Sequence, residues 1–277
     1  MRPIGQAAVR IAVALRPLVW VGVAAGLCLG PAALHAGELV IGAAASLREP
    51  VEWLAEAQRR AHPETVLRVS FGASSTIAAQ IRLGAPVDAF LSANRALVDD
   101  LILRERVDAE DVFEFARNGL VVIAPARSVA SFADPSALRA PTIERIALPA
   151  VAVPLGRYAR AWLDASGLLD AVSDKIVVTE HARSTLAAVD AGHADVGIVY
   201  ATDARTSDRS RVVYVIPESM APEIAYYAAR TRTGRQNRAT RAFVAAVRGP
   251  AFAEALLRAG FLPPHEARSP APEAKQP

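Results

Sequence analysis

Two short turns of small and hydroxylated residues are the part of this sequence best suited to bind a ligand. Ser46 lies in the turn Ala-Ala-Ala-Ser-Leu at 43–47, and Ser74 lies in the turn Phe-Gly-Ala-Ser-Ser-Thr at 71–76. Each turn follows an apolar run and precedes a helical pattern, so each should contain a helix N-terminus. The N–H groups there are unpaired and carry a partial positive charge, and small side chains let a ligand reach them. The two turns therefore predict an anion site.

An alternative interpretation is that these serines only cap helices. Ser46 and Glu49 have the spacing of a capping box, in which the two side chains satisfy N–H groups of the first helical turn. Capping is the commoner use of a serine at a helix start, so each turn taken alone favours it. The presence of a second serine turn weakens this alternative without removing it.

Tyr200 is a third candidate, because it ends the apolar run Val-Gly-Ile-Val-Tyr at 196–200. A phenol can donate one hydrogen bond to an anion while its ring packs against apolar surface. A half-buried structural tyrosine is the more common outcome for a single residue of this type. Tyr200 is therefore a candidate only in combination with the two serine turns.

Catalysis by a serine nucleophile is the alternative from a different functional class. It would need His181 or His193 as the base, but no G-x-S-x-G motif surrounds Ser46 or Ser74. His193 lies in the polar segment Ala-Gly-His-Ala-Asp, where a solvated histidine is expected. We therefore predict a binding protein and not an enzyme, which an ester-hydrolysis assay would test.

The sequence predicts no cofactor and no direct metal ligand. Glu180 and His181 form an isolated pair without the companion ligands of a C-x-x-C or H-x-x-x-H motif. Arg183, close to this pair, has two interpretations: it positions the loop and raises the local potential, or it forms an ion pair at the surface or between two lobes.

Short apolar runs alternate with helical patterns along most of the chain, which is typical of βαβ units around a parallel sheet. Strands are expected at 39–43, 66–71, 87–91, 119–125, 146–148, 176–179 and 196–200. Helices are expected around 51–55, 77–81, 97–103, 158–165, 186–189, 242–247 and 252–256. A second set of units starts at 119, so we predict two α/β lobes. The turns that follow parallel strands lie side by side at one sheet edge, where ligands bind.

The two ends of the chain differ from the rest in composition. Residues 1–36 have a basic start, an apolar stretch at 18–29 and small residues after it, which indicate a secretory signal peptide. Cys28, the single cysteine, belongs to this segment, so the mature protein should have no disulfide. Residues 263–277 are rich in Pro, Ala and charge and are expected to be disordered.

The charge balance argues against a nucleic-acid partner. Three of the 31 basic residues lie in the predicted signal peptide, which leaves 28 basic against 28 acidic residues. The remaining arginines are interleaved with Asp and Glu and do not form the basic stripe of a nucleic-acid-binding protein.

Seven landmarks occur in an order that matches one protein family. They are Ala-Ala-Ala-Ser-Leu at 43–47, Ser-Phe-Gly-Ala-Ser-Ser-Thr at 70–76, Gly-Ala-Pro-Val-Asp at 84–88 with Leu-Ser-Ala at 91–93, Asn-Gly-Leu-Val-Val-Ile-Ala-Pro at 118–125, Val-Pro-Leu-Gly-Arg-Tyr-Ala at 153–159, Gly-Ile-Val-Tyr at 197–200, and Arg-Gly-Pro at 248–250 followed by Gly-Phe at 260–261. By these motifs the chain resembles the periplasmic molybdate-binding proteins of ABC transporters, which are type II periplasmic solute-binding proteins. The resemblance extends over about residues 38–262.

The resemblance implies a two-lobed α/β fold with the ligand in the cleft between the lobes. Each lobe would be a mixed, mostly parallel sheet flanked by helices. One lobe would comprise residues 37–119 plus 223–262, and the other residues 120–222. The lobes are expected to close on the ligand.

By the same resemblance, five residues would bind the anion. They are Ser46 and Ser74 through hydroxyl and backbone N–H groups, Leu155 and Ala182 through backbone N–H groups, and Tyr200 through its hydroxyl. Molybdate would be bound as an oxyanion through these groups.

The chain departs from the family pattern around this site. Family members usually have Asp near Leu148, Ala at Leu155, Asp or Asn at His181 and Val at Ala182. Backbone donors tolerate a change of side chain, so the site should persist. The bulk of Leu155 could shift the preferred anion.

The resemblance implies capture of molybdate or tungstate in the periplasm by a monomeric protein. The protein would deliver the anion to the membrane permease of an ABC transporter. The alternative that stays open is a binding or sensor protein for another small oxyanion. Neighbouring genes for a permease and an ATPase would favour uptake over sensing.

Overall fold

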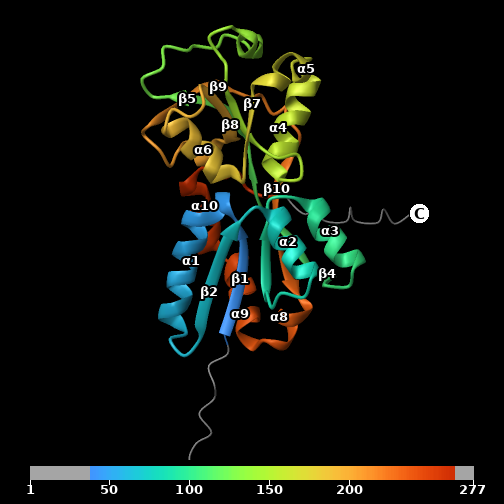
Figure 1. Cartoon of the computed structure of the whole chain (residues 1–277). Helices are drawn as coiled ribbons and strands as arrows, with labels where there is room; N and C mark the ends of the chain where they lie inside the picture. Colours follow the sequence, from blue (N-terminus) through green and yellow to red (C-terminus); the bar gives the residue numbers. More distant parts are fainter. Residues whose placement is uncertain (1–37, 266–277) are drawn as a thin grey trace, which may run out of the picture. The chain divides into compact units, whose positions relative to one another are not determined.

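Two five-stranded sheets organise residues 38–265, the part of the chain that the computed structural model describes (Figure 1). The first sheet has the order β2-β1-β3-β10-β4, and the second has the order β7-β6-β8-β5-β9. The first comprises β1 (Glu38–Ala44), β2 (Val66–Gly72), β3 (Ala89–Ser92), β4 (Val107–Asn118) and β10 (Ile224–Thr231). The second comprises β5 (Leu120–Pro125), β6 (Ile146–Pro149), β7 (Ile176–Thr179), β8 (Val196–Tyr200) and β9 (Ser210–Val215).

Helices pack against both sheets. With the first sheet belong the 3-10 helix η1 (Ala45–Leu47) and the helices α1 (Arg48–Ala61), α2 (Ser74–Arg82), α3 (Arg95–Leu103), α8 (Arg232–Gln236), α9 (Arg238–Val247) and α10 (Pro250–Ala259). With the second belong η2 (Pro135–Arg139), α4 (Pro154–Ala165), α5 (Leu169–Val172), η3 (Ser173–Lys175), α6 (Ala182–Asp190) and α7 (Ala201–Ala204). Among residues 38–265, none of these helices combines the length and the apolar character needed to cross a bilayer.

Each sheet is mixed, with a single strand reversed. In the first sheet β1 is parallel to β2 and β3, whereas β10 is antiparallel to its neighbours β3 and β4. In the second sheet β6 is parallel to β7 and β8, whereas β5 is antiparallel to β8 and β9. The predicted fold class, two α/β lobes with mixed and mostly parallel sheets, is confirmed.

The end of β1 and the start of α2 are brought together by close packing. β1 is buried along most of its length, as is usual for a parallel strand covered on both faces. Gly42 faces α2 so closely that a Cβ atom there would lie 2.6 Å from Cγ2 of Ile77. This approach places Ser74, the first residue of α2, next to the segment that contains Ser46.

The chain passes between the two sheets at two places. The first passage is Gly119, between β4 and β5, and the second lies between Val215 and Ile224. The predicted division into lobes, at 119/120 and at 222/223, stays a prediction.

No strand is predicted from the sequence at residues 107–118, 210–215 or 224–231, and the structure has strands there. β4 is the clearest case, because its sequence Val-Asp-Ala-Glu-Asp-Val-Phe-Glu-Phe-Ala-Arg-Asn looks too acidic for a strand. The structure explains this acidity by partners on neighbouring elements. Oδ1 of Asp111, for example, lies 2.6 Å from Nη2 of Arg230 on β10.

Two predictions concern the ends of the chain. The signal peptide at 1–36 lies outside the described residues, as do residues 266–277 of the tail. The first tail residues, 263–265, lie against β4, where Arg117 Nε donates to the Pro263 carbonyl at 2.8 Å. The backbone N–H of His265 donates to Oε1 of Glu114 at 2.9 Å.

Candidate functional site

All five residues predicted to bind an anion line one cavity. Its lining is Ala44, Ala45, Ser46, Gly72, Ala73, Ser74, Ala93, Val153, Pro154, Leu155, His181, Ala182 and Tyr200. The cavity offers about 20 Å³ to the centres of water-sized groups, and a single water needs about 10–15 Å³ on that scale. Its size therefore suits a small polyatomic ion better than a sugar or a peptide.

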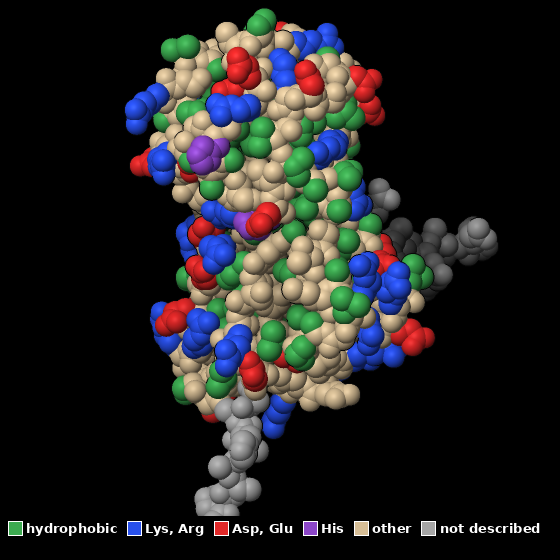
Figure 2. Space-filling view, viewed as in Figure 1, with side chains coloured by type: hydrophobic (Ala, Val, Ile, Leu, Met, Phe, Trp, Pro, Cys, Tyr) green, Lys and Arg blue, Asp and Glu red, His purple; other side chains and the backbone are tan. Residues whose placement is uncertain are grey.

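The cavity wall is mostly small and apolar, with a few hydroxyl and backbone polar groups and without formal charge. Within the described residues, no Asp, Glu, Lys or Arg contributes to its wall, and His181 and Tyr200 are its titratable members. Elsewhere, acidic and basic side chains are scattered among one another on the face shown in Figure 2. A ligand in the cavity would therefore be recognised by dipoles and hydrogen bonds.

The helices α2, α4 and α6 begin at the cavity wall with Ser74, Pro154 and Ala182, and η1 begins there with Ala45. The first N–H groups of a helix have no partner within that helix. At α4, Pro154 occupies the first position, where its missing N–H costs nothing, and Leu155 supplies the next N–H. The cavity thus gathers backbone donors and the positive ends of three helix dipoles.

Neither predicted serine caps a helix. The N-cap residues of α1 and α2 are Leu47 and Ala73, and neither helix has a side-chain cap. Ser46 Oγ instead lies 3.0 Å from the hydroxyl of Tyr226, and Ser74 Oγ accepts the N–H of Ala93 at 3.1 Å. The capping interpretation is therefore wrong, because both hydroxyls are engaged with residues far away in the chain.

A relay of side chains leaves the Tyr226 hydroxyl able to donate to Ser46. Asn118 Oδ1 accepts the N–H of Gly119 at 2.9 Å, and its Nδ2 donates to Thr202 Oγ1 at 2.8 Å and to the Tyr226 oxygen at 3.2 Å. Tyr226 therefore has its own proton left to donate to Ser46 Oγ. The Ser46 proton is then free to point at a ligand, as is that of Ser74.

Tyr200 carries the most informative polar atom of the cavity. Its side chain is 2% exposed, and its hydroxyl has no hydrogen-bond partner among the described residues. Burial raises the pKa of this phenol well above its usual value, so it stays protonated and is a donor. An unpaired buried hydroxyl costs about 1–3 kcal/mol. A ligand that accepts from Tyr200 would remove this cost.

A second relay joins the two lobes beside the cavity. Asn94 caps α3 through Oδ1, and its Nδ2 donates to the hydroxyl of Tyr158 on α4 at 2.9 Å. That hydroxyl donates in turn to the Ala93 carbonyl at 3.1 Å. Asn94, Tyr158 and Tyr226 are not among the site residues predicted from the sequence. Tyr158 lies within the family motif at 153–159, so that motif could have indicated it. Tyr226 lies in none of the seven motifs.

His181 caps α6 from within the cavity wall. Its Nδ1 accepts the N–H of Ser184 at 3.2 Å, and Ser184 Oγ accepts the N–H of His181 at 2.9 Å. Nδ1 must be unprotonated to do this, so the neutral ring carries its proton on Nε2. Burial is the main cause that lowers the pKa of His181; Glu180 opposes it, and Arg48 and Arg183 add to the lowering.

Replacing His181 by asparagine should remove an acid-sensitive part of the stability. Asparagine is a good N-cap, so α6 keeps its start. Because the folded-state pKa of His181 lies below 6.5, the unfolded chain takes up the proton first as the pH falls. The wild type should therefore lose stability relative to His181→Asn below about pH 6.5, with a constant difference above it. Urea unfolding at about pH 5 and about pH 7.5 measures this. The control is His193→Asn, since His193 is exposed; equal behaviour of the two variants would contradict the prediction.

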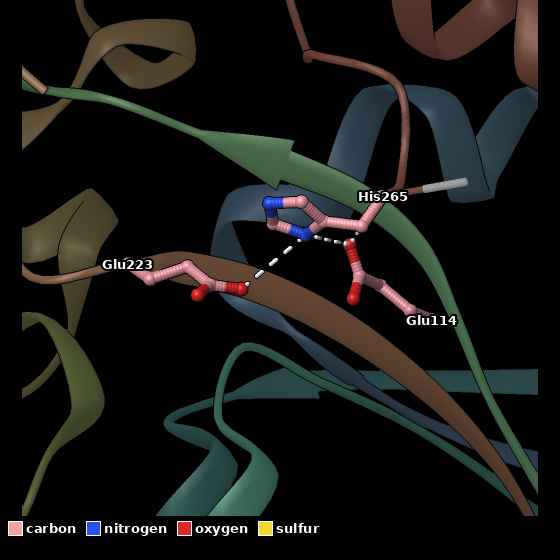
Figure 3. Close-up of side chains that lie close together, drawn as sticks. All are labelled: Glu114, Glu223 and His265. Carbon is pink, nitrogen blue, oxygen red and sulfur yellow. Dashed lines mark hydrogen bonds and ion pairs between the residues drawn. The ribbon is translucent and has the colours of Figure 1, made fainter. Parts of the chain in front are cut away.

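A second cluster of titratable side chains lies away from the cavity and ties down residues 263–265 (Figure 3). Nδ1 of His265 lies 3.2 Å from Oε1 of Glu114 and 3.3 Å from Oε1 of Glu223. Nε2 of the same ring lies 3.3 Å from Nη1 of Arg117, which can only donate. The proton therefore sits on Nδ1, between the carboxylates. A metal bound at Nδ1 would move this proton to Nε2, where it would face the N–H groups of Arg117. We therefore interpret the cluster as hydrogen bonds that hold residues 263–265 against β4.

Comparison with known proteins adds an independent finding. Residues 39–262 match the family described as bacterial extracellular solute-binding protein. The molybdate-binding protein ModA of Escherichia coli (strain K12) is 33% identical over 252 residues, which are 87% of this chain and 97% of that protein. ModA of Haemophilus influenzae is 31% identical over 239 residues, or 84% of this chain and 93% of that protein.

A solved structure agrees with this finding at the level of the fold. The periplasmic molybdate-binding protein of Azotobacter vinelandii superposes with a TM-score of 0.73 at 21% sequence identity. The match covers 81% of this chain and 98% of that one. The arrangement of the two sheets is therefore that of a two-lobed solute-binding protein.

Proposed function

The chain belongs to the family of bacterial extracellular solute-binding proteins, and we propose that it captures a tetrahedral oxyanion, with molybdate and tungstate as the preferred ligands. The anion would lie in the cavity and accept from the hydroxyls and backbone N–H groups of Ser46 and Ser74. Backbone N–H groups of Leu155 and Ala182 and the hydroxyl of Tyr200 complete the set.

The observation that carries this proposal is the buried, unpaired hydroxyl of Tyr200, which faces a cavity whose other polar groups are also donors. Among the described residues the cavity wall has several hydrogen-bond donors and no carboxylate, so it suits an anion better than a cation. Two relatives over 30% identical are named for molybdate binding, which supports the same class of ligand.

Hydrogen bonds alone are sufficient for tight binding. Seven bonds to a charged ligand contribute roughly 10–20 kcal/mol at about 1.5–3 kcal/mol each. Association costs an estimated 4–15 kcal/mol in lost freedom. The balance is compatible with micromolar to nanomolar dissociation constants, since 1 μM corresponds to about 8 kcal/mol.

Selectivity would follow from protonation and size. A cavity that only donates leaves the proton of hydrogen phosphate without an acceptor, which costs about 1–3 kcal/mol. Sulfate has no such proton, so it must be excluded by the dimensions of the cavity. Leu155, whose side chain is 1% exposed and packs into the core at the cavity wall, helps to set those dimensions.

In the cell, the protein would act as a periplasmic monomer that hands its ligand to the permease of an ABC transporter. It would need no cofactor, and it would not be an enzyme. Within residues 38–265, no His, Asp or Glu forms a hydrogen bond with the hydroxyl of Ser46, Ser74 or Tyr200. The alternative keeps the binding site and changes the role, to a binding or sensor protein for another small oxyanion.

Calorimetric titration of the anion-free protein tests this proposal directly. We expect one-to-one binding of molybdate and of tungstate that persists in a large excess of sulfate. Competition by sulfate would place the protein with general oxyanion binders, which is the alternative. Absence of heat with all three anions would overturn the oxyanion function.

A further inference from the structure

Arg183, the second residue of α6, lies outside the cavity wall and contacts three other side chains. Its Nη2 donates to the carboxylate of Glu49 on α1, and its Nη1 donates to Thr206 Oγ1 at 2.6 Å. Its Nε lies 2.8 Å from Oδ1 of Asp203 on α7. Each nitrogen of the guanidinium therefore lies close to a different side chain, and one of these side chains, Glu49, belongs to the other lobe.

The charged members of this network each follow a proposed anion-binding residue along the chain. The pairs are Ser46 and Glu49, Ala182 and Arg183, and Tyr200 and Asp203. Arg183 thus connects the segment of the first lobe that contains Ser46 with the two segments of the second lobe that contain Ala182 and Tyr200. Arg183 therefore links the cavity wall of the first lobe to that of the second.

The two ends of the network differ in how firmly they hold Arg183. The Asp203 side chain is 0% exposed, that of Arg183 is 18% exposed, and that of Glu49 is 48% exposed. Burial raises the pKa of Asp203 to about 7, and the charge of Arg183 opposes this rise. The Arg183 N–H does not point at Oδ1, so this contact is an ion pair without a hydrogen bond. The hydrogen bond to Thr206 and the ion pair with the fully buried Asp203 keep Arg183 within its own lobe, whereas its contact with the exposed Glu49 is the one that can be released.

We propose that Arg183 and Glu49 form a latch between the lobes that slows the escape of a bound anion. This inference rests on the proposed function. Arg183 acts as a positioning residue: it does not touch the anion but holds the closed arrangement in which donors from both lobes reach it. A groove lined by Ser46, Glu49 and Arg183 runs beside the contact, so dissolved salt reaches the latch.

The sharpest test shortens the latch without changing its charge. Glu49→Asp keeps the carboxylate and withdraws it by one methylene, so a purely electrostatic effect on the anion is nearly unchanged. The matched control is Glu52→Asp, on the same helix, where Glu52 pairs with Arg48 of its own helix at 3.0 Å. Arg183 itself is left in place, because its removal would leave the buried Asp203 without a counter-ion and could unfold the protein.

We expect Glu49→Asp to raise the molybdate dissociation constant about threefold to fivefold, mostly through faster release, and Glu52→Asp to change it less than about twofold. The difference in dissociation constant between the two variants should become smaller in about 1 M salt, because the Debye length is then about 3 Å and the ion pair is screened.

The outcomes separate the latch from the proposed function. Wild-type protein that binds none of molybdate, tungstate and sulfate would overturn both. Wild-type binding together with equal constants for Glu49→Asp and Glu52→Asp would overturn the latch alone. Tighter binding by Glu49→Asp would also overturn it, because a shortened latch cannot slow release.

Discussion

Tyr200→Phe is expected to weaken oxyanion binding by about 1.5–3 kcal/mol, or roughly 10- to 150-fold, because a hydrogen bond to a charged ligand contributes that much. The free protein should be unaffected or slightly more stable. The lost hydroxyl is buried and has no partner among the described residues, so its removal ends a desolvation cost. Calorimetry gives the affinity, and thermal unfolding without anion gives the stability.

The opposite signs of these two effects make the experiment decisive. Tyr227→Phe is the control, since Tyr227 on β10 is not part of the cavity wall. It should leave the dissociation constant unchanged. Wild-type affinity in Tyr200→Phe would remove Tyr200 from the site. A large loss of stability without anion would show that the hydroxyl has a structural role instead.

Gly156→Ala is expected to destabilise the fold by about 2–4 kcal/mol and to abolish anion binding. Alanine is the better helix former by about 1 kcal/mol, so propensity alone would predict stabilisation. The added Cβ, however, would lie 2.2 Å from the Ala150 carbonyl oxygen and 2.4 Å from that of Pro149. These are backbone atoms that cannot rotate away, so the clash outweighs the propensity and displaces the start of α4.

Urea unfolding and calorimetry measure this effect. The displacement should carry the Leu155 N–H out of the cavity, so binding is lost even in molecules that stay folded. Gly119→Ala is the matched control, because its Cβ would meet only Ala201 at 3.9 Å. If Gly156→Ala is as stable as the control and binds with normal affinity, the prediction is wrong. The loop at 149–153 would then move to make room for the Cβ atom without displacing the start of α4.

The cavity could be predicted from the sequence because its donors follow directly from local patterns. A hydroxyl or a small residue at the boundary between an apolar run and a helix marks a helix N-terminus, wherever the rest of the chain goes. Ser46 and Ser74 were identified in this way from their turns. Tyr200 was a candidate because it ends an apolar run, and Leu155 and Ala182 came from the family resemblance, which the comparisons support over residues 39–262. All five line the same cavity, and their contact with an anion stays a prediction.

The groups that orient these donors could not be predicted, because they come from distant parts of the chain. Tyr226 reaches Ser46 across 180 positions, and Asn118 reaches Tyr226 across 108. Tyr226 stands on β10, which inserts antiparallel between β3 and β4. The spacing of apolar residues along the sequence does not indicate where a strand inserts in a sheet. β4 itself was not predicted as a strand because its sequence is acidic. Its acidic side chains pair with arginines that come close to them only when the sheet has formed.

By itself, then, the sequence determined the alternation of strands and helices, the near-neutral charge of the predicted mature chain and the small, hydroxylated turns at helix starts. These are local properties, set by side-chain periodicity and by which residues tolerate a helix end. Only the tertiary structure decided which way each hydroxyl can donate, that the Tyr200 phenol is left without a partner, and that Arg183 spans to Glu49. Hydrogen bonds and ion pairs depend on distances of about 3 Å, and such distances between distant residues exist only once the sheets have packed.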